Sequence, residues 1–137
     1  MAAPTTTAPD RAAPLLRAAI ALQTAALFFQ AATAGLLLSS SHGEVLHSVG
    51  ARVMYGASML YVLAAILAWR PGGGTPRPIL DASGFLALAS VQVVLGIAHK
   101  PALHVPLGTL MFALSVLALH RSLTRTGTAG GPPRRTP

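Results

Sequence analysis

The sequence predicts an all-α fold, a transmembrane bundle of four helices connected up-down-up-down, with both termini in the cytoplasm. Of its 137 residues 53% are apolar and only 9% are charged, whereas soluble domains contain about 25% charged residues. The apolar residues form four runs, each close to the roughly 20 residues that a helix needs to cross a bilayer. Almost all arginines lie between these runs or in the tails.

The four runs define the predicted domain organisation. Backbone groups in lipid must form hydrogen bonds within their own segment, so each run is predicted to be helical. A cytoplasmic tail at 1–13 precedes a transmembrane domain at 14–122. The predicted helices cover residues 14–38, 42–69, 79–98 and 101–120. The tail at 123–137, rich in Thr, Gly, Pro and Arg, is predicted to be disordered and cytoplasmic.

Each break between the runs has its own signal. Three serines precede His42, and Ser41-x-x-Glu44 fits a capping box that would start the second helix. The segment 71–76, Pro-Gly-Gly-Gly-Thr-Pro, is incompatible with a continuous helix. The third connection is very short, and Pro101 suits the first turn of the fourth helix.

The charge distribution predicts the orientation. The net charge is +7, and both tails and the second loop carry most of it, whereas the first loop has none and the third has only Lys100. Because positive loops stay in the cytoplasm, we predict a multi-pass protein of the cell membrane with its histidine loops outside. A nucleic-acid module would gather arginines among aromatics on one face, so no nucleic-acid partner is expected. The absence of cysteine excludes disulfides and thiol chemistry.

A pattern in the second run recurs in the fourth, 57 residues later. His42-x-x-x-Leu46-His47 corresponds to His99-x-x-x-Leu103-His104. After each second histidine come a small residue at +4, a methionine at +7 and a serine at +11: Ala51, Met54 and Ser58 in one run, Gly108, Met111 and Ser115 in the other. These spacings lie on one stripe of a helix. The chain is therefore predicted to contain a tandem repeat of two-helix units.

The repeat places His47 and His104 at equivalent positions on the second and fourth helices. These helices are diagonal partners in such a bundle, and with adjacent axes roughly 8–10 Å apart the diagonal is about 11–14 Å. That spacing suits two imidazoles on either side of one metal ion, and Ala51 and Gly108 leave room for a flat ring. We therefore predict haem b with both histidines as iron ligands. The alternative is that the histidines only anchor helix ends at the membrane interface.

The neighbouring residues have predicted roles around that cofactor. His42 and His99 lie one to two turns further out, where they contact haem propionates or are solvated. Met54 and Met111 pack in the pocket rather than coordinate the metal. Glu44 either orients the histidine three residues later or is only the acid of the capping box.

Polar residues elsewhere have structural interpretations. Gln30 and Gln92 are predicted to form interhelical hydrogen bonds, because an unpaired amide in lipid is costly. Ser58 and Ser115 are predicted to bond to their own helix backbones. His120 is interpreted as an anchor at the cytoplasmic interface.

Short motifs resemble the heme A synthase family over about residues 20–120. Gln92-Val-Val-Leu95-Gly96, followed by a short loop and His104, resembles the third and fourth helices of that family, and Glu44-Val-Leu-His47 resembles its Glu-x-x-His motif. The family consists of two four-helix halves, each with a histidine pair on its second and fourth helices. The resemblance implies that this chain corresponds to one half, binds haem and, if enzymatic, is a haem-modifying oxidoreductase with Glu44 as a candidate catalytic residue.

The chain departs from the family pattern in three ways. It has four predicted spans instead of eight, Ser48 replaces the arginine after the motif histidine, and the cysteine pair of the first outer loop is missing. The resemblance therefore implies haem b binding more strongly than it implies oxidation of haem O to haem A. That oxidation needs a cofactor haem and a substrate haem, which would require a homodimer or a partner membrane haem protein.

Three functions follow from the sequence. The first is a haem-binding bundle in electron transfer, haem handling or oxidase assembly. The second is a haem-free accessory subunit that packs against a larger membrane complex. The third is a zinc or copper site at the outer face, whose candidate ligands are His42, Glu44, His47, His99 and His104.

Overall fold

The computed structural model describes residues 12–70 and 75–124, which form four helices and no strand. The helices are α1 (Ala12–Leu37), α2 (His42–Trp69), α3 (Arg77–Ile97) and α4 (Pro101–Thr124). All four are long and apolar enough to cross a membrane. The chain is therefore a multi-pass membrane protein of the all-α class.

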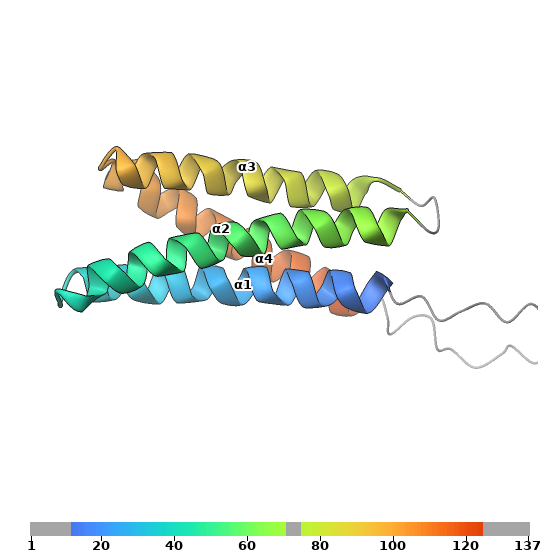
Figure 1. The fold of residues 1–137 in the computed structure, drawn as a ribbon, viewed down its shortest axis with the longest axis horizontal. Coiled ribbons are helices and arrows are strands. Elements are labelled where there is room, and N and C mark those ends of the chain that lie inside the picture. The colour runs from blue at the N-terminus through green and yellow to red at the C-terminus, as the bar shows by residue number, and fades with distance from the viewer. Residues whose placement is uncertain (1–11, 71–74, 125–137) are drawn as a thin grey trace, which may run out of the picture.

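The helices form an antiparallel ring in chain order, as Figure 1 shows. Each packs against the helices before and after it, and α1 also packs against α4. Consequently α1 and α3 are one diagonal pair and α2 and α4 the other, as the sequence predicts. The start of α1 and the end of α4 lie at the same end of the bundle (Figure 1). From α3, α4 runs obliquely across the bundle and ends beside α1.

The helix limits differ from the predicted ones by a few residues. The first helix already includes Ala12 and Ala13, and α3 starts at Arg77 with a proline in its first turn, where proline is tolerated. The fourth helix continues to Thr124, so Leu123 is helical and the predicted start of the tail is wrong. The remaining predicted tail residues lie outside the described residues.

The turn between α1 and α2 is tighter than a capping box allows. Ser41 has a helical backbone, with φ −63° and ψ −26°, and makes no side-chain cap hydrogen bond. A capping serine requires a non-helical backbone, so the predicted capping box is wrong. Instead, helix-like bonds fill the turn, because the Ser40 N–H donates to the Leu36 carbonyl (3.0 Å) and the Gly43 N–H to that of Ser40 (3.1 Å). Glu44 remains in the first turn of α2, where a carboxylate stabilises the helix dipole.

Gly43 allows this close approach of the two helices. A Cβ atom at this position would lie 2.5 Å from backbone atoms of Leu36 and Leu37, which cannot move aside as a side chain can. We expect Gly43→Ala to destabilise the folded bundle by about 1–3 kcal/mol, measured as a lower unfolding midpoint in detergent. Gly56→Ala is the control: no atom lies within 4 Å of its added Cβ, so it should stabilise α2 by about 0.5–1 kcal/mol. An unchanged midpoint for Gly43→Ala would contradict the close contact.

The turn between α3 and α4 is a Schellman motif. The His99 N–H donates to the Gly96 carbonyl (3.1 Å) and the Lys100 N–H to that of Leu95 (3.0 Å), the two bonds that define this helix ending. His99 has φ 51°, the left-handed conformation for which glycine is the usual residue. Pro101 then opens α4, as predicted. His99 thus has a backbone role in the turn.

A polar layer lies near the middle of the bundle. Ser58 and Ser115 are buried and donate to carbonyls of their own helices, at 3.0 and 2.8 Å, as predicted. The Ser58 hydroxyl also lies 3.1 Å from Oε1 of Gln23 on α1. The side-chain oxygen of Gln30 lies 3.4 Å from the Thr33 hydroxyl of its own helix. In this layer the interhelical side-chain hydrogen bond is therefore made by Gln23, for which none was predicted.

Candidate functional site

His47 and His104 meet across the centre of the bundle. Their ring centroids are 6.1 Å apart, and the ring planes are inclined by 67°. Both residues lie within the first two turns of their helices, at the same end of the bundle, and both rings are half-buried. Within the described residues α2 and α4 lie on opposite sides of the bundle, and their backbones do not approach each other closely. The contact therefore spans the diagonal, as the repeat predicts.

The surroundings of His104 determine its tautomer. Its Nδ1 lies 3.0 Å from the backbone carbonyl oxygen of Gln92 on α3. A carbonyl only accepts hydrogen bonds, so Nδ1 carries the proton and donates it. The lone pair of the neutral ring is then on Nε2, which is the arrangement found in histidines that bind metals.

Thr33 of α1 is the corresponding partner of His47. Its Oγ1 lies 3.2 Å from His47 Nδ1 and 3.1 Å from the Gln30 carbonyl oxygen. When the hydroxyl donates to that carbonyl, its oxygen accepts from Nδ1–H, and Nε2 of His47 again keeps the lone pair. The side chain of Thr33 is 1% exposed, so water does not compete for this contact.

A cavity of about 340 Å³ adjoins both histidines and extends one to two turns deeper into the bundle. Its lining comes from all four helices and is mostly apolar. The residues are Leu27, Gln30, Ala31, Ala34, His47, Ala51, Met54, Gln92, Val93, His104, Val105, Gly108, Thr109 and Phe112. Ala51, Gly108 and Met54, which are predicted to surround a cofactor, line this cavity. Met111 is fully buried and packs outside this lining.

Gln92 contributes to the cavity in two ways. Its backbone carbonyl orients His104, and its side-chain amide lies over Gly108, where an added Cβ would be 2.7 Å from Nε2. The side chain is 8% exposed, and its Oε1 has no hydrogen-bond partner. An unpartnered buried oxygen is costly, so this amide is a strained element of the cavity wall.

The separation of the two rings suits the two axial ligands of one metal ion. A metal–imidazole bond of about 2.0–2.1 Å places the ion roughly 3.2 Å from a ring centre, so rings on opposite sides would be about 6.4 Å apart. The observed 6.1 Å is close to this value. The donor set, two neutral imidazoles beside a cavity with small residues, fits a flat group whose metal takes two protein ligands.

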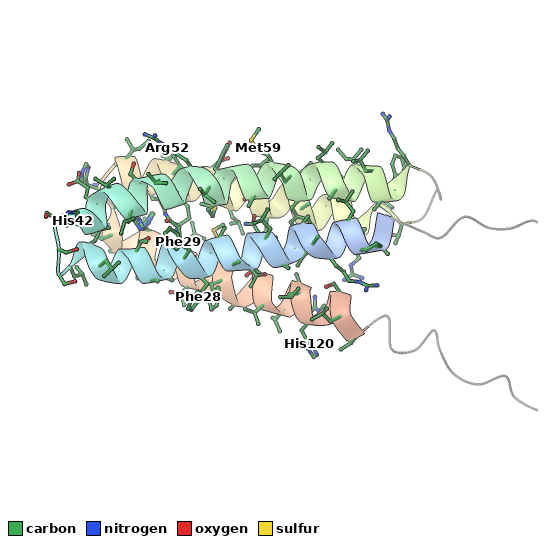
Figure 2. All side chains as sticks on the ribbon, turned by 60° about the horizontal axis from the view of Figure 1, so that its bottom comes forward. Phe28, Phe29, His42, Arg52, Met59 and His120 are labelled. Atoms are coloured by element: carbon green, nitrogen blue, oxygen red, sulfur yellow. The ribbon has the colours of Figure 1, made fainter. Side chains whose placement is uncertain are left out.

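The other predicted site residues lie further from the cavity. His42, Glu44 and His99 are exposed, and Figure 2 shows His42 at the outer tip of α2. A hydrogen-bonding partner of His47 is Thr33 on α1. The orienting and catalytic roles of Glu44 stay predictions. His120 is exposed at the opposite end of the bundle (Figure 2).

The zinc or copper site is not assembled in this arrangement. In the described part of the chain, no three or more His, Asp or Glu side chains are grouped so that they could hold a metal ion. His42, Glu44 and His99 are exposed, whereas the two paired rings are half-buried.

Two contributions to the site were not predicted from the sequence. The sequence pattern assigns no role to Thr33 and predicts only an interhelical hydrogen bond for Gln92. A polar residue inside a span was the only available signal, since an unpartnered hydroxyl or amide is costly in lipid. No family model, curated protein or solved structure matches the chain.

Proposed function

We propose that this protein binds one b-type haem between α2 and α4, with His47 and His104 as its axial ligands. The observation that carries the proposal is the 6.1 Å separation of the two rings beside a cavity lined by Ala51 and Gly108. Hydrogen bonds at both Nδ1 atoms, to Thr33 and to Gln92, also support it because they favour Nε2 as the ligand atom. The protein would act in electron transfer, haem handling or oxidase assembly.

The protein would orient the two axial ligands, adjust their basicity and exclude water from the cofactor. When bound, the haem would supply one-electron redox chemistry. Thr33 and the Gln92 carbonyl hold the imidazole rings in place and increase their basicity. Leu27 and Met54 are buried and line the deeper part of the cavity, where they would keep water from the macrocycle.

The resemblance to heme A synthase is part of this proposal. One bundle has one diagonal histidine pair, which would serve one haem. Conversion of a substrate haem would therefore need a second copy of the chain or a partner membrane haem protein, with Glu44 as a catalytic candidate. Crosslinking in native membranes would test this: a strictly monomeric protein that converts haem O to haem A would contradict it.

The visible spectrum of the purified protein tests the proposal directly. The chain should be expressed with ample haem supply, purified in mild detergent, and examined in its oxidised and dithionite-reduced forms. We expect a Soret band and sharp reduced bands of low-spin haem, with one haem per chain. A well-folded but colourless protein would refute haem binding and favour the haem-free accessory subunit.

We also propose that the histidine end of the bundle faces outwards. Arg17, Arg70, Arg77 and Arg121 lie near the other end, whereas the histidine half of the bundle carries Lys100 and Arg52. Four cations against two favour cytoplasmic termini. Fusions of a periplasm-dependent reporter after Ser40 should be active, and fusions after Gly73 inactive. The reverse pattern would overturn this orientation.

Thr33 should affect the haem through His47. Thr33→Val keeps the shape of the side chain but removes the hydroxyl, so the imidazole loses its orienting bond and becomes less basic. We expect a higher haem midpoint potential and a broader low-spin signal, whereas Thr33→Ser should restore the wild-type values. A redox titration with electron paramagnetic resonance measures both. Equal potentials for wild type and Thr33→Val would show that the hydroxyl does not tune the ligand.

A further inference from the structure

Two of the four helix interfaces around the cavity are joined near the histidines. Between α1 and α2, Gly43 and Gly50 allow close contact, and an added Cβ at Gly50 would clash with the side chain of Gln30. Between α2 and α3, the hydroxyl groups of Tyr55 and Ser90 lie 3.3 Å apart, two turns deeper than His47, but the cavity-lining residues Ala51 and Val93 of these helices are half-buried. Between α3 and α4, the bond from His104 to the Gln92 carbonyl joins the helices.

Unlike the contacts at Gly43 and at the Gln92 carbonyl, the interface between α1 and α4 is joined only at a greater depth. The rings of Phe28 and Phe112 lie 6.1 Å apart, and the Thr24 hydroxyl lies 3.3 Å from the Ser115 carbonyl oxygen. Phe112 and Ser115 are two to three turns beyond His104 along α4. Figure 2 shows Phe28 on the side of α1 nearest α4. The oblique course of α4 explains the difference, because this helix approaches α1 only towards its C-terminal end (Figure 1).

Between these contacts and the histidine end of the bundle, small residues of α1 and α4 border the cavity. We call this region the α1–α4 seam, and it consists of Ala31, Ala34, Val105 and Thr109. Ala31, Val105 and Thr109 are exposed even though they line the cavity. The hydroxyl of Thr109 donates to the Val105 carbonyl at 3.1 Å, so it presents no unpaired polar group to the lipid. The seam is therefore the apolar side on which the cavity opens.

We propose that the haem enters and leaves the cavity sideways, from the lipid phase, through the α1–α4 seam. This inference rests on the proposed haem binding. The seam lies within membrane-spanning helices, so acyl chains rather than water lie next to it. The cavity volume of about 340 Å³ is at the low end of the range of about 300–1,000 Å³ for ligand sites. A porphyrin is larger than that volume, so one edge would remain in the seam, where a partner in the membrane could reach it.

The test measures haem uptake from a bilayer. Haem-free protein is placed in phosphatidylcholine vesicles, haemin dissolved in the same vesicles is added by fusion, and the growth of the Soret band is followed. Ala31→Trp and Val105→Trp obstruct the seam from opposite sides. Each should slow both the uptake of haem and its release to apomyoglobin by about tenfold or more, because an obstructed path raises the barrier in both directions. A variant that only lowered the haem affinity would instead release its haem faster. Val94→Trp is the matched control, because Val94 is 63% exposed on α3 and does not line the cavity; its uptake rate should equal that of the wild type.

A covalent closure gives an independent measurement. The chain has no cysteine, so Ala31→Cys with Thr109→Cys introduces a single pair that a short bismaleimide can link. Linking after loading should trap the haem and slow its transfer to apomyoglobin, and linking before loading should prevent uptake. If both tryptophan variants and the linked protein exchange haem at the wild-type rates and show a normal Soret band, lateral access is wrong, but the proposed haem binding still holds. A wild-type protein that takes up no haem would overturn the proposed function and this inference together.

Discussion

Replacing His47 or His104 with alanine is expected to convert the low-spin haem to a five-coordinate, high-spin form. Each ring supplies one of two axial bonds, and no third His, Asp or Glu joins the pair to replace a lost ligand in the described residues. The double variant should lose the haem during purification. Absorption and electron paramagnetic resonance spectra of the purified variants measure both changes.

Two controls make this prediction specific. His42→Ala and His99→Gly remove exposed imidazoles, and glycine suits the left-handed backbone of residue 99, so both proteins should keep the low-spin spectrum. Free imidazole added to His47→Ala should restore six-coordinate haem if the cavity remains intact. The ligand assignment fails if the double variant keeps the wild-type spectrum.

Gly108→Leu is expected to reduce haem occupancy while both ligands remain in place. The first atom of the new side chain would be 2.7 Å from Gln92 Nε2, and the remaining atoms would occupy the space one turn below His104. Overpacking of about 1–3 kcal/mol corresponds to a roughly 5- to 150-fold lower affinity. Titration of the haem-free protein with haemin measures this change.

Gly84→Leu is the matched control for that substitution. Gly84 is exposed on α3, and no atom lies within 4 Å of an added Cβ, so its haem affinity should equal that of the wild type. Equal affinities for Gly108→Leu and the wild type would show that the ligand does not occupy the space beside Gly108.

The sequence by itself determined the spans and the depth of the candidate site. Four long apolar runs with so few charges can only be accommodated by lipid, and helices are the structures that satisfy their backbones there. The 3.6-residue period then places Ala51 on the same stripe as His47, and Gly108 on the same stripe as His104. Short connections make consecutive helices antiparallel, which puts the two histidines on diagonal helices.

Only the tertiary structure decided which side chains contact the histidines and where the cavity opens. Thr33 lies next to His47, and Gln92 next to His104, because of how α1 and α3 are rotated and how deeply they sit against α2 and α4. Ser41 fails as a cap because the close approach at Gly43 leaves no room for an extended turn. Periodicity fixes the face and depth of a residue on its own helix. The rotation and crossing angle of neighbouring helices depend on packing between residues far apart in the sequence, which no local pattern encodes.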